Sequence, residues 1–313
     1  MKVIMDVDTG IDDAIAISLM LGHPSVEMLG LTTVSGNVPL EQVVQNTRRL
    51  CTYLDASIPI YIGASKPLCR QAIHEHHVHG GNGLGGVDLP DGGNEHVHQS
   101  ISAAQWMCET VTKHPHEVTL LMTGPLTNLA LALAIDPDLP SKVHQVVFMG
   151  GAAQTYGNIT PLAEFNIYVD PEAAKNVVHA GFRSLTMVGL DVTRQTLLTP
   201  AQLDTLPENK TSQLLKSMTA HYMKRYEERN GIQACAMHDP LAAGAVLWPD
   251  VLKTTPYYVD VETNSELCDG QTVCDIQERW KKAPNVDVAT AVDAERFMSA
   301  MLAQLANKEE SKS

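Results

Sequence analysis

The chain has 313 residues, with 22 basic and 36 acidic side chains and a net charge of −14. This acidic balance argues against nucleic acid as a partner, because clusters of Lys and Arg usually contact phosphate backbones. No apolar run is long enough to suggest a membrane span. Six cysteines without a Cys-x-x-Cys pair indicate reduced thiols in a cytoplasmic protein, and they argue against a zinc site or a disulfide framework.

Apolar runs alternate with helical periodicities, a pattern that predicts an α/β protein with one open, mainly parallel sheet flanked by helices. The expected strands are residues 3–5, 26–35, 58–62, 118–122, 143–149 and 185–190. The expected helices are residues 12–20, 40–54, 101–113, 126–135, 212–229 and 241–247, with another beginning at 171 and a last one near 294. Short strands near 257–261, 272–275 and 286–291 predict a small extra β element. We expect one domain over residues 1–306 and a polar C-terminal tail over 307–313.

The first predicted strand leads into four acidic residues within eight positions. Asp6 and Asp8 follow the strand, and Asp12 and Asp13 open the next helix. A single Asp at a helix N-terminus is often only a cap, but that explanation does not account for four acids. Like charges this close repel one another, and a hard cation with oxygen ligands relieves the repulsion. Ligands of open α/β sheets bind at the carboxyl ends of strands, so the segment predicts a cation site.

These acids have three other possible interpretations. An EF-hand loop fails, because its twelfth position must be Glu and here it is Ile17 or Leu19. A Mg²⁺-dependent phosphatase of the haloacid dehalogenase type, with Asp6 as nucleophile, remains an alternative. A non-catalytic protein that binds nucleosides or sugars is a second alternative.

Polar groups follow several other predicted strands: Asn37, the main-chain carbonyl of Thr123, Asn158, Glu164 and Asn166. The Thr123 carbonyl is expected to face the same crevice as Asp8. The pair His238-Asp239 stands before a predicted helix start, as Asp12-Asp13 does. Residues 63–100 form a long segment rich in Gly and His, as in active-site lids, and His79 beside Gly80 is its best candidate for proton transfer. Together these groups indicate a cation-dependent enzyme acting on a small polyhydroxy substrate. No motif supports a Ser or Cys nucleophile.

The segment Asp6–Ala14, DVDTGIDDA, resembles the N-terminal signature of the calcium-dependent nucleoside hydrolases. The resemblance continues in family order at residues 34–37, around 79, and at 124–128, 149–151, 157–158, 163–166, 170–174 and 238–239. It is nearest to the inosine-uridine or pyrimidine-preferring bacterial branch. One departure is the segment Met149–Asn158, which is one residue longer than the family's form and points to a difference in base preference.

This resemblance implies hydrolysis of the N-glycosidic bond of uridine, cytidine or inosine to ribose and free base, an activity of nucleoside salvage. The implied reaction uses a Ca²⁺-held water activated by Asp8, with His238 as a second catalytic group, and leaves Asp6 a structural role. The implied Ca²⁺ ligands are Asp8, Asp13, Asp239 and the carbonyl of Thr123. The implied ribose-binding residues are Asp12, Asn37, Met149, Asn158, Glu164, Asn166 and Asp239. The implied residues near the base are His79, Tyr226 and His238. The family also implies a homo-oligomer, a tetramer or a dimer.

Overall fold

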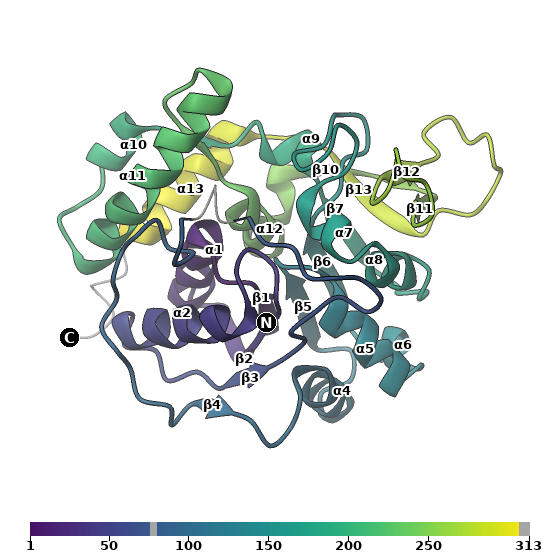
Figure 1. The fold of residues 1–313 in the computed structure, drawn as a ribbon, viewed down its shortest axis with the longest axis horizontal. Helices are drawn as coiled ribbons and strands as arrows, with labels where there is room; N and C mark the ends of the chain where they lie inside the picture. The colour runs from purple at the N-terminus through teal and green to yellow at the C-terminus, as the bar shows by residue number, and fades with distance from the viewer. Residues whose placement is uncertain (76–79, 307–313) are drawn as a thin grey trace.

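A computed structural model of the protein describes residues 1–75 and 80–306. Its main feature is a nine-stranded sheet, shown in Figure 1. From one edge to the other the strands are β10 (Leu252–Tyr257), β13 (Val286–Val292), β7 (Leu185–Val188), β6 (Gln145–Met149), β5 (Val118–Met122), β1 (Lys2–Val7), β2 (Glu27–Thr33), β3 (Ile60–Ile62) and β4 (Val97–His98). Only β10 pairs antiparallel with its neighbour, so the expected mainly parallel α/β sheet is confirmed.

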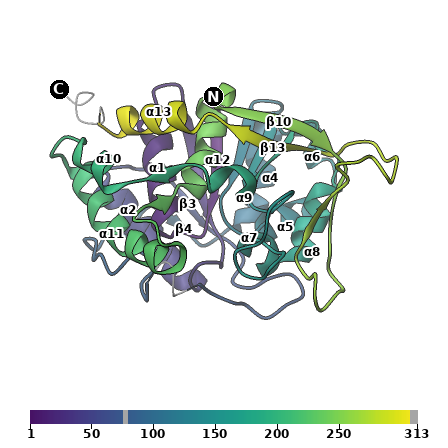
Figure 2. The same cartoon turned by 90° about the horizontal axis from the view of Figure 1, so that it is seen from above.

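Helices cover both faces of the sheet (Figures 1 and 2). One layer contains α1 (Ile11–Gly22), α2 (Leu40–Tyr53), α10 (Pro200–Asp204), α11 (Lys210–Asn230), α12 (His238–Leu247) and α13 (Ala294–Ala306). The other contains α4 (Ala103–Lys113), α5 (Thr127–Ile135), α6 (Leu139–Lys142) and α8 (Pro171–Val178). Each layer has its own buried apolar cluster against the sheet. Among the described residues, no helix is long and apolar enough to cross a membrane.

Short elements complete the structure. Helices α7 (Phe165–Val169) and α9 (Leu190–Thr193) are single turns, and the 3₁₀ turn η1 covers Pro249–Val251. Strands β11 (Val259–Val261) and β12 (Thr272–Cys274) form the expected extra β element, which lies outside the main sheet in Figure 1. The expected strand at 286–291 does not belong to it, because these residues lie in β13 and pair with β10 and β7 of the main sheet. A second pair, β8 (Leu197–Leu198) and β9 (Cys235–Ala236), was not predicted. Within the described part of residues 63–100, only β4 is regular.

The first strand is longer than its apolar run predicted, because it continues through Asp6 and Val7. Parallel pairing on both sides places Asp6 opposite Thr32 of β2 and Met122 of β5. The buried Asp6 carboxylate accepts hydrogen bonds from Thr32 Oγ1 at 2.5 Å and from Asn128 Nδ2 at 2.7 Å. Both donors reach Oδ1, whereas Oδ2 is buried without a partner among the described residues, and burial raises the pKa of Asp6 to about 7. The two hydrogen bonds offset part of the cost of burying this polar side chain inside a central strand.

The strand order reverses beside β1. From β1 the chain adds β2, β3 and β4 on one side, and then β5, β6 and β7 on the other. In open α/β sheets, the carboxyl ends of the strands at such a switch point form the ligand crevice. Here the segments that follow β1 and β5 lie together, and the main-chain N–H of Thr123 donates to the carbonyl of Asp6 at 2.8 Å. The fold therefore places the four N-terminal acids at the expected crevice.

The packing of β2 against α4 gives a stability prediction. A Cβ at Gly30 would lie 2.6 Å from the ring of Trp106 and 3.1 Å from the carbonyl oxygen of Pro59. Trp106 is stacked on Tyr61, with ring centroids 4.0 Å apart, so its ring has little room to move. We expect Gly30→Ala to lower the free energy of unfolding by about 1–3 kcal/mol in urea titrations. Gly81→Ala is the control, since nothing lies within 4 Å of its Cβ position. Equal stability of the two variants would contradict this packing.

Candidate functional site

The turn between β1 and α1 holds three buried aspartates: Asp8, Asp12 and Asp13. Asp13 helps to cap the N-terminus of α1, because its carboxylate accepts the main-chain N–H of Gly10 at 2.8 Å. It also accepts the Thr123 hydroxyl at 2.7 Å, which joins this turn to the end of β5. The three aspartate side chains are therefore held at the start of α1 and are buried away from bulk water.

The side chain of Asp8 packs against Gly36 and Gly124, which leave room for it because they have no Cβ. Its Oδ2 accepts the main-chain N–H of Asn37 at 2.7 Å. Its Oδ1 is buried, and within the described part of the chain it has no hydrogen-bond partner. A Cβ at Gly36 would lie 2.1 Å from Oδ2, and one at Gly124 would lie 3.1 Å from Oδ1. A buried carboxylate oxygen without a donor is costly, so this atom is available for a ligand.

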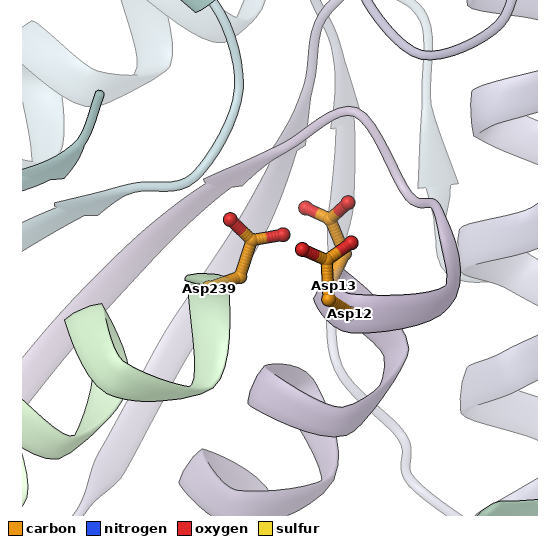
Figure 3. A group of neighbouring side chains, drawn as sticks. All are labelled: Asp12, Asp13 and Asp239. Atoms are coloured by element: carbon orange, nitrogen blue, oxygen red, sulfur yellow. The ribbon is translucent and has the colours of Figure 1, made fainter. Parts of the chain in front are cut away.

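Asp239 reaches the same place from the first turn of α12, which packs directly against α1. Figure 3 shows its carboxylate converging with those of Asp12 and Asp13 on one space. The potential ligand oxygens of these three residues all lie within 4.8 Å of one another, a grouping that can hold a metal ion. Each of the three side chains is at least 95% buried.

The electrostatics of this cluster are unfavourable without a positive charge. Burial raises the pKa of Asp8 well above its ordinary value, and the charge of Asp13 raises it further. Burial also raises the pKa of Asp239, with additional repulsion from Asp12, Asp13 and Asp8. For Asp12, burial raises the pKa to about 6. An all-oxygen set of crowded carboxylates suits a hard divalent cation, which would stabilise their ionised forms.

Amide and carboxylate groups stand beside the cluster. Asn166 Nδ2 donates to the carbonyl oxygens of Thr123 at 2.8 Å and Met149 at 3.2 Å. Glu164 caps α7 and accepts main-chain N–H groups, including that of Gly151 at 3.0 Å, while burial raises its pKa to about 7. Asn158 Oδ1 accepts a main-chain N–H of α7 at 2.8 Å. This hydrogen bond connects the loop that carries Asn158 to α7, the helix that carries Asn166.

His238 and Tyr226 lie on the side of the cavity formed by α11 and α12. The Nδ1 of His238 and the Thr193 hydroxyl form a hydrogen bond of 2.8 Å, which orients the ring. Tyr226 is half-buried, and burial raises the pKa of its phenol. Both side chains line the same cavity as Asp239.

The structure brings most of the predicted site residues to one cavity. Those that line it are Asp12, Asn37, Thr123, Met149, Asn158, Glu164, Asn166, Tyr226, His238 and Asp239. Asp8 and Asp13 are fully buried, next to the turn residues Gly10, Gly36 and Asn37. His79 lies outside the described residues. Asp6 is not among the lining residues, and its carboxylate faces Thr32 and Asn128, which argues against a nucleophilic role.

Several lining residues were not predicted from the sequence. They are Glu75, Tyr156, Phe165, Leu190, Arg194, Tyr222, Arg225, Arg229 and Asn230. Those on α11 belong to an amphipathic pattern, and that pattern does not distinguish a cavity wall from a solvated face. Tyr156 carries the one sequence signal among them, because it is an aromatic residue in the polar segment after β6.

Comparisons with known proteins agree with this geometry. The family model for inosine-uridine preferring nucleoside hydrolase matches residues 3–299. The pyrimidine-specific ribonucleoside hydrolase RihB of Escherichia coli is 36% identical over 298 residues, which are 95% of this chain and 94% of that protein. The solved structure of the purine-preferring ribonucleoside hydrolase from Gardnerella vaginalis has a TM-score of 0.91 and 33% identity, covering 98% of this chain and 99% of the other.

An inosine-guanosine nucleoside hydrolase is also similar, with a TM-score of 0.87 and 31% identity over 97% of this chain and 98% of that one. The expected resemblance, fold and enzyme class are therefore confirmed. The chain belongs to the inosine-uridine preferring nucleoside hydrolase family, and it hydrolyses the N-glycosidic bond of ribonucleosides.

Proposed function

We propose that this enzyme uses Ca²⁺, held by the carboxylates of Asp8, Asp13 and Asp239 and by the carbonyl of Thr123. The observation that carries the proposal is the buried Asp8 Oδ1, which has no donor within the described chain although it lies in a crowded group of acids. The donors are all oxygens, which is the set that Ca²⁺ prefers over softer ions. Bound Ca²⁺ would neutralise these acids and help to orient water and the ribose hydroxyls.

Asp8 is proposed as the general base that takes a proton from the attacking water. Asp8 is buried, and its Oδ1 has no hydrogen-bond donor within the described chain, so this oxygen could accept a proton from a water held beside it. Cleavage of an N-glycosidic bond develops positive charge on the ribose ring, as in other glycosyl transfers. The buried acids beneath the sugar favour that charge more strongly in the transition state than in the ground state.

The ribose hydroxyls are assigned to the polar floor of the cavity. The proposed contacts are Asp12, Asn37, Met149, Asn158, Glu164, Asn166 and Asp239. Their support is that every one of them lines the cavity beside the carboxylate group. Main-chain N–H groups of Phe165 and Gly151 donate to Asn158 and Glu164, which holds these side chains in place before substrate arrives.

His238 is proposed to donate a proton to the departing base, with Tyr226 and His79 near the base. His238 is oriented by Thr193 and lies one residue before Asp239, so it is close to the reacting centre. Uridine, cytidine and inosine are the proposed substrates. The similar proteins differ in the bases that their names specify, since one is pyrimidine-specific and another purine-preferring.

We also propose that residues 1–306 act as one catalytic domain and that the enzyme is a cytoplasmic homo-oligomer. All six cysteines are free thiols, which suits a reducing compartment. Leu131 and Ile135 of the apolar helix α5 are exposed, as expected for a surface that another subunit covers.

The base role predicts the behaviour of Asp8→Asn. The amide keeps the shape of the side chain but cannot accept the proton, so ribose release should fall by about 10³-fold while the circular dichroism spectrum is retained. Asp88→Asn is the matched control, because the Asp88 side chain is 91% exposed and does not line the cavity. Near-normal turnover of Asp8→Asn would remove Asp8 from this role.

The metal proposal predicts a change that does not depend on activity. After prolonged treatment with a chelator, the enzyme should unfold at a lower temperature in calorimetry and lose ribose release. Adding Ca²⁺ at 100 times its Kd should restore about 2.7 kcal/mol of stability. Restoration by Mg²⁺ but not by Ca²⁺ would identify a different ion, and unchanged melting would argue against a metal site.

The acid role of His238 predicts a loss that depends on the leaving group. His238→Ala should reduce turnover of inosine and uridine by about 10²–10⁴-fold. The loss should be small for 4-nitrophenyl riboside, whose nitrophenolate leaves without being protonated. Comparable losses for all three substrates would show that His238 does not protonate the base.

A further inference from the structure

The cavity has two regions of different character. Its floor is buried and polar, with Asp239 3% exposed and Asn166 6% exposed. Its mouth carries aromatic and arginine side chains, and one of these, Tyr156, is 67% exposed. A nucleoside with its ribose hydroxyls on the floor must direct its base toward the mouth. The residues at the mouth can therefore contact the base.

Tyr156 is held in place by Arg194, which follows α9. The guanidinium carbon of Arg194 lies 3.9 Å from the centroid of the Tyr156 ring. Arg194 Nη1 donates to the carbonyl of Tyr156 at 2.7 Å and to the hydroxyl of Thr155 at 3.1 Å, and Nη2 donates to the carbonyl of Gly157 at 2.7 Å. The guanidinium therefore fixes both the ring and the loop that carries it.

A second arginine fixes the end of the same loop. Arg229 of α11 donates from Nη2 to the carbonyl of Asn158 at 2.7 Å. The loop is thus tied to the segment after β7 and to α11, which both line the cavity. Since Arg194 covers one face of the ring while about two thirds of the residue remains exposed, the opposite face is open. Such a fixed aromatic surface can stack on a planar base at little entropic cost.

We propose that Tyr156, positioned by Arg194, stacks on the nucleobase of the bound ribonucleoside and sets the preference of the enzyme among bases. The inference rests on the proposed placement of the ribose on the cavity floor. Because a purine overlaps a phenol ring over a larger area than a pyrimidine does, Tyr156 favours purine nucleosides. Arg194 acts through Tyr156 as a positioning residue and does not itself touch the base.

The test measures kcat and KM for inosine and uridine in Tyr156→Ala, Tyr156→Phe, Arg194→Met and the double variant Tyr156→Ala/Arg194→Met. Stacking of one base on an aromatic side chain is worth about 1–3 kcal/mol, or roughly 5–150-fold. Tyr156→Ala should therefore raise KM for inosine by about tenfold or more, and less for uridine, with kcat changed little. Tyr156→Phe keeps the ring and should lose far less.

Arg194→Met should raise KM in the same direction, and should add little in the background of Tyr156→Ala, because the two side chains act as one unit. Trp280→Ala is the control, since Trp280 is a half-exposed aromatic residue that does not line the cavity. It should leave both constants unchanged.

Equal KM values for wild type and Tyr156→Ala with both nucleosides would overturn this inference while leaving the proposed function intact. Equal losses in the Ala and Phe variants, or fully additive effects of Tyr156→Ala and Arg194→Met, would also overturn it. A wild-type enzyme that releases no ribose from either nucleoside would instead overturn the proposed function and the inference with it.

Discussion

Repulsion among buried carboxylates is the constraint on which the rest of the structure depends. Asp8, Asp13 and Asp239 are packed together away from water, and burial and mutual charge raise the pKa values of Asp8 and Asp239. Hydrogen bonds from Gly10, Asn37 and Thr123 satisfy only part of this oxygen-rich group. In the proposed mechanism a bound cation would supply what is missing, and the negative charge that remains at the site would favour a ribose that becomes positive during bond cleavage.

The fold supplies this geometry through the reversal of strand order beside β1. Pairing of β1 with β2 and β5 is reinforced by Asp6, whose carboxylate accepts from Thr32 and Asn128 and so links two strands and α5. Packing of α12 on α1 adds Asp239, which lies more than 200 residues further along the chain than Asp13. The acids that the site needs therefore come from turns and helix starts that the sheet holds rigidly.

Local patterns predicted the elements well where burial alone decides them. Strand β5 has the predicted bounds, since each of its residues is buried. The prediction was too short at β1, because Asp6 is accommodated by Asn128, which lies 122 residues away and leaves no local signal. Arg229 and Tyr226 both belong to the amphipathic helix α11, and only the tertiary structure shows that they border the cavity. The cation site was predictable from the sequence, because four acidic residues within eight positions have few purely structural explanations.

The central claim, that the acid cluster binds calcium, is tested most directly by a crystal structure grown with Ca²⁺ and ribose. Anomalous scattering would locate the ion independently of the protein atoms. The account predicts one Ca²⁺ about 2.3–2.6 Å from oxygens of Asp8, Asp13, Asp239 and Thr123. Crystals without an ion at this position, or with an ion that Asp8 does not contact, would contradict it.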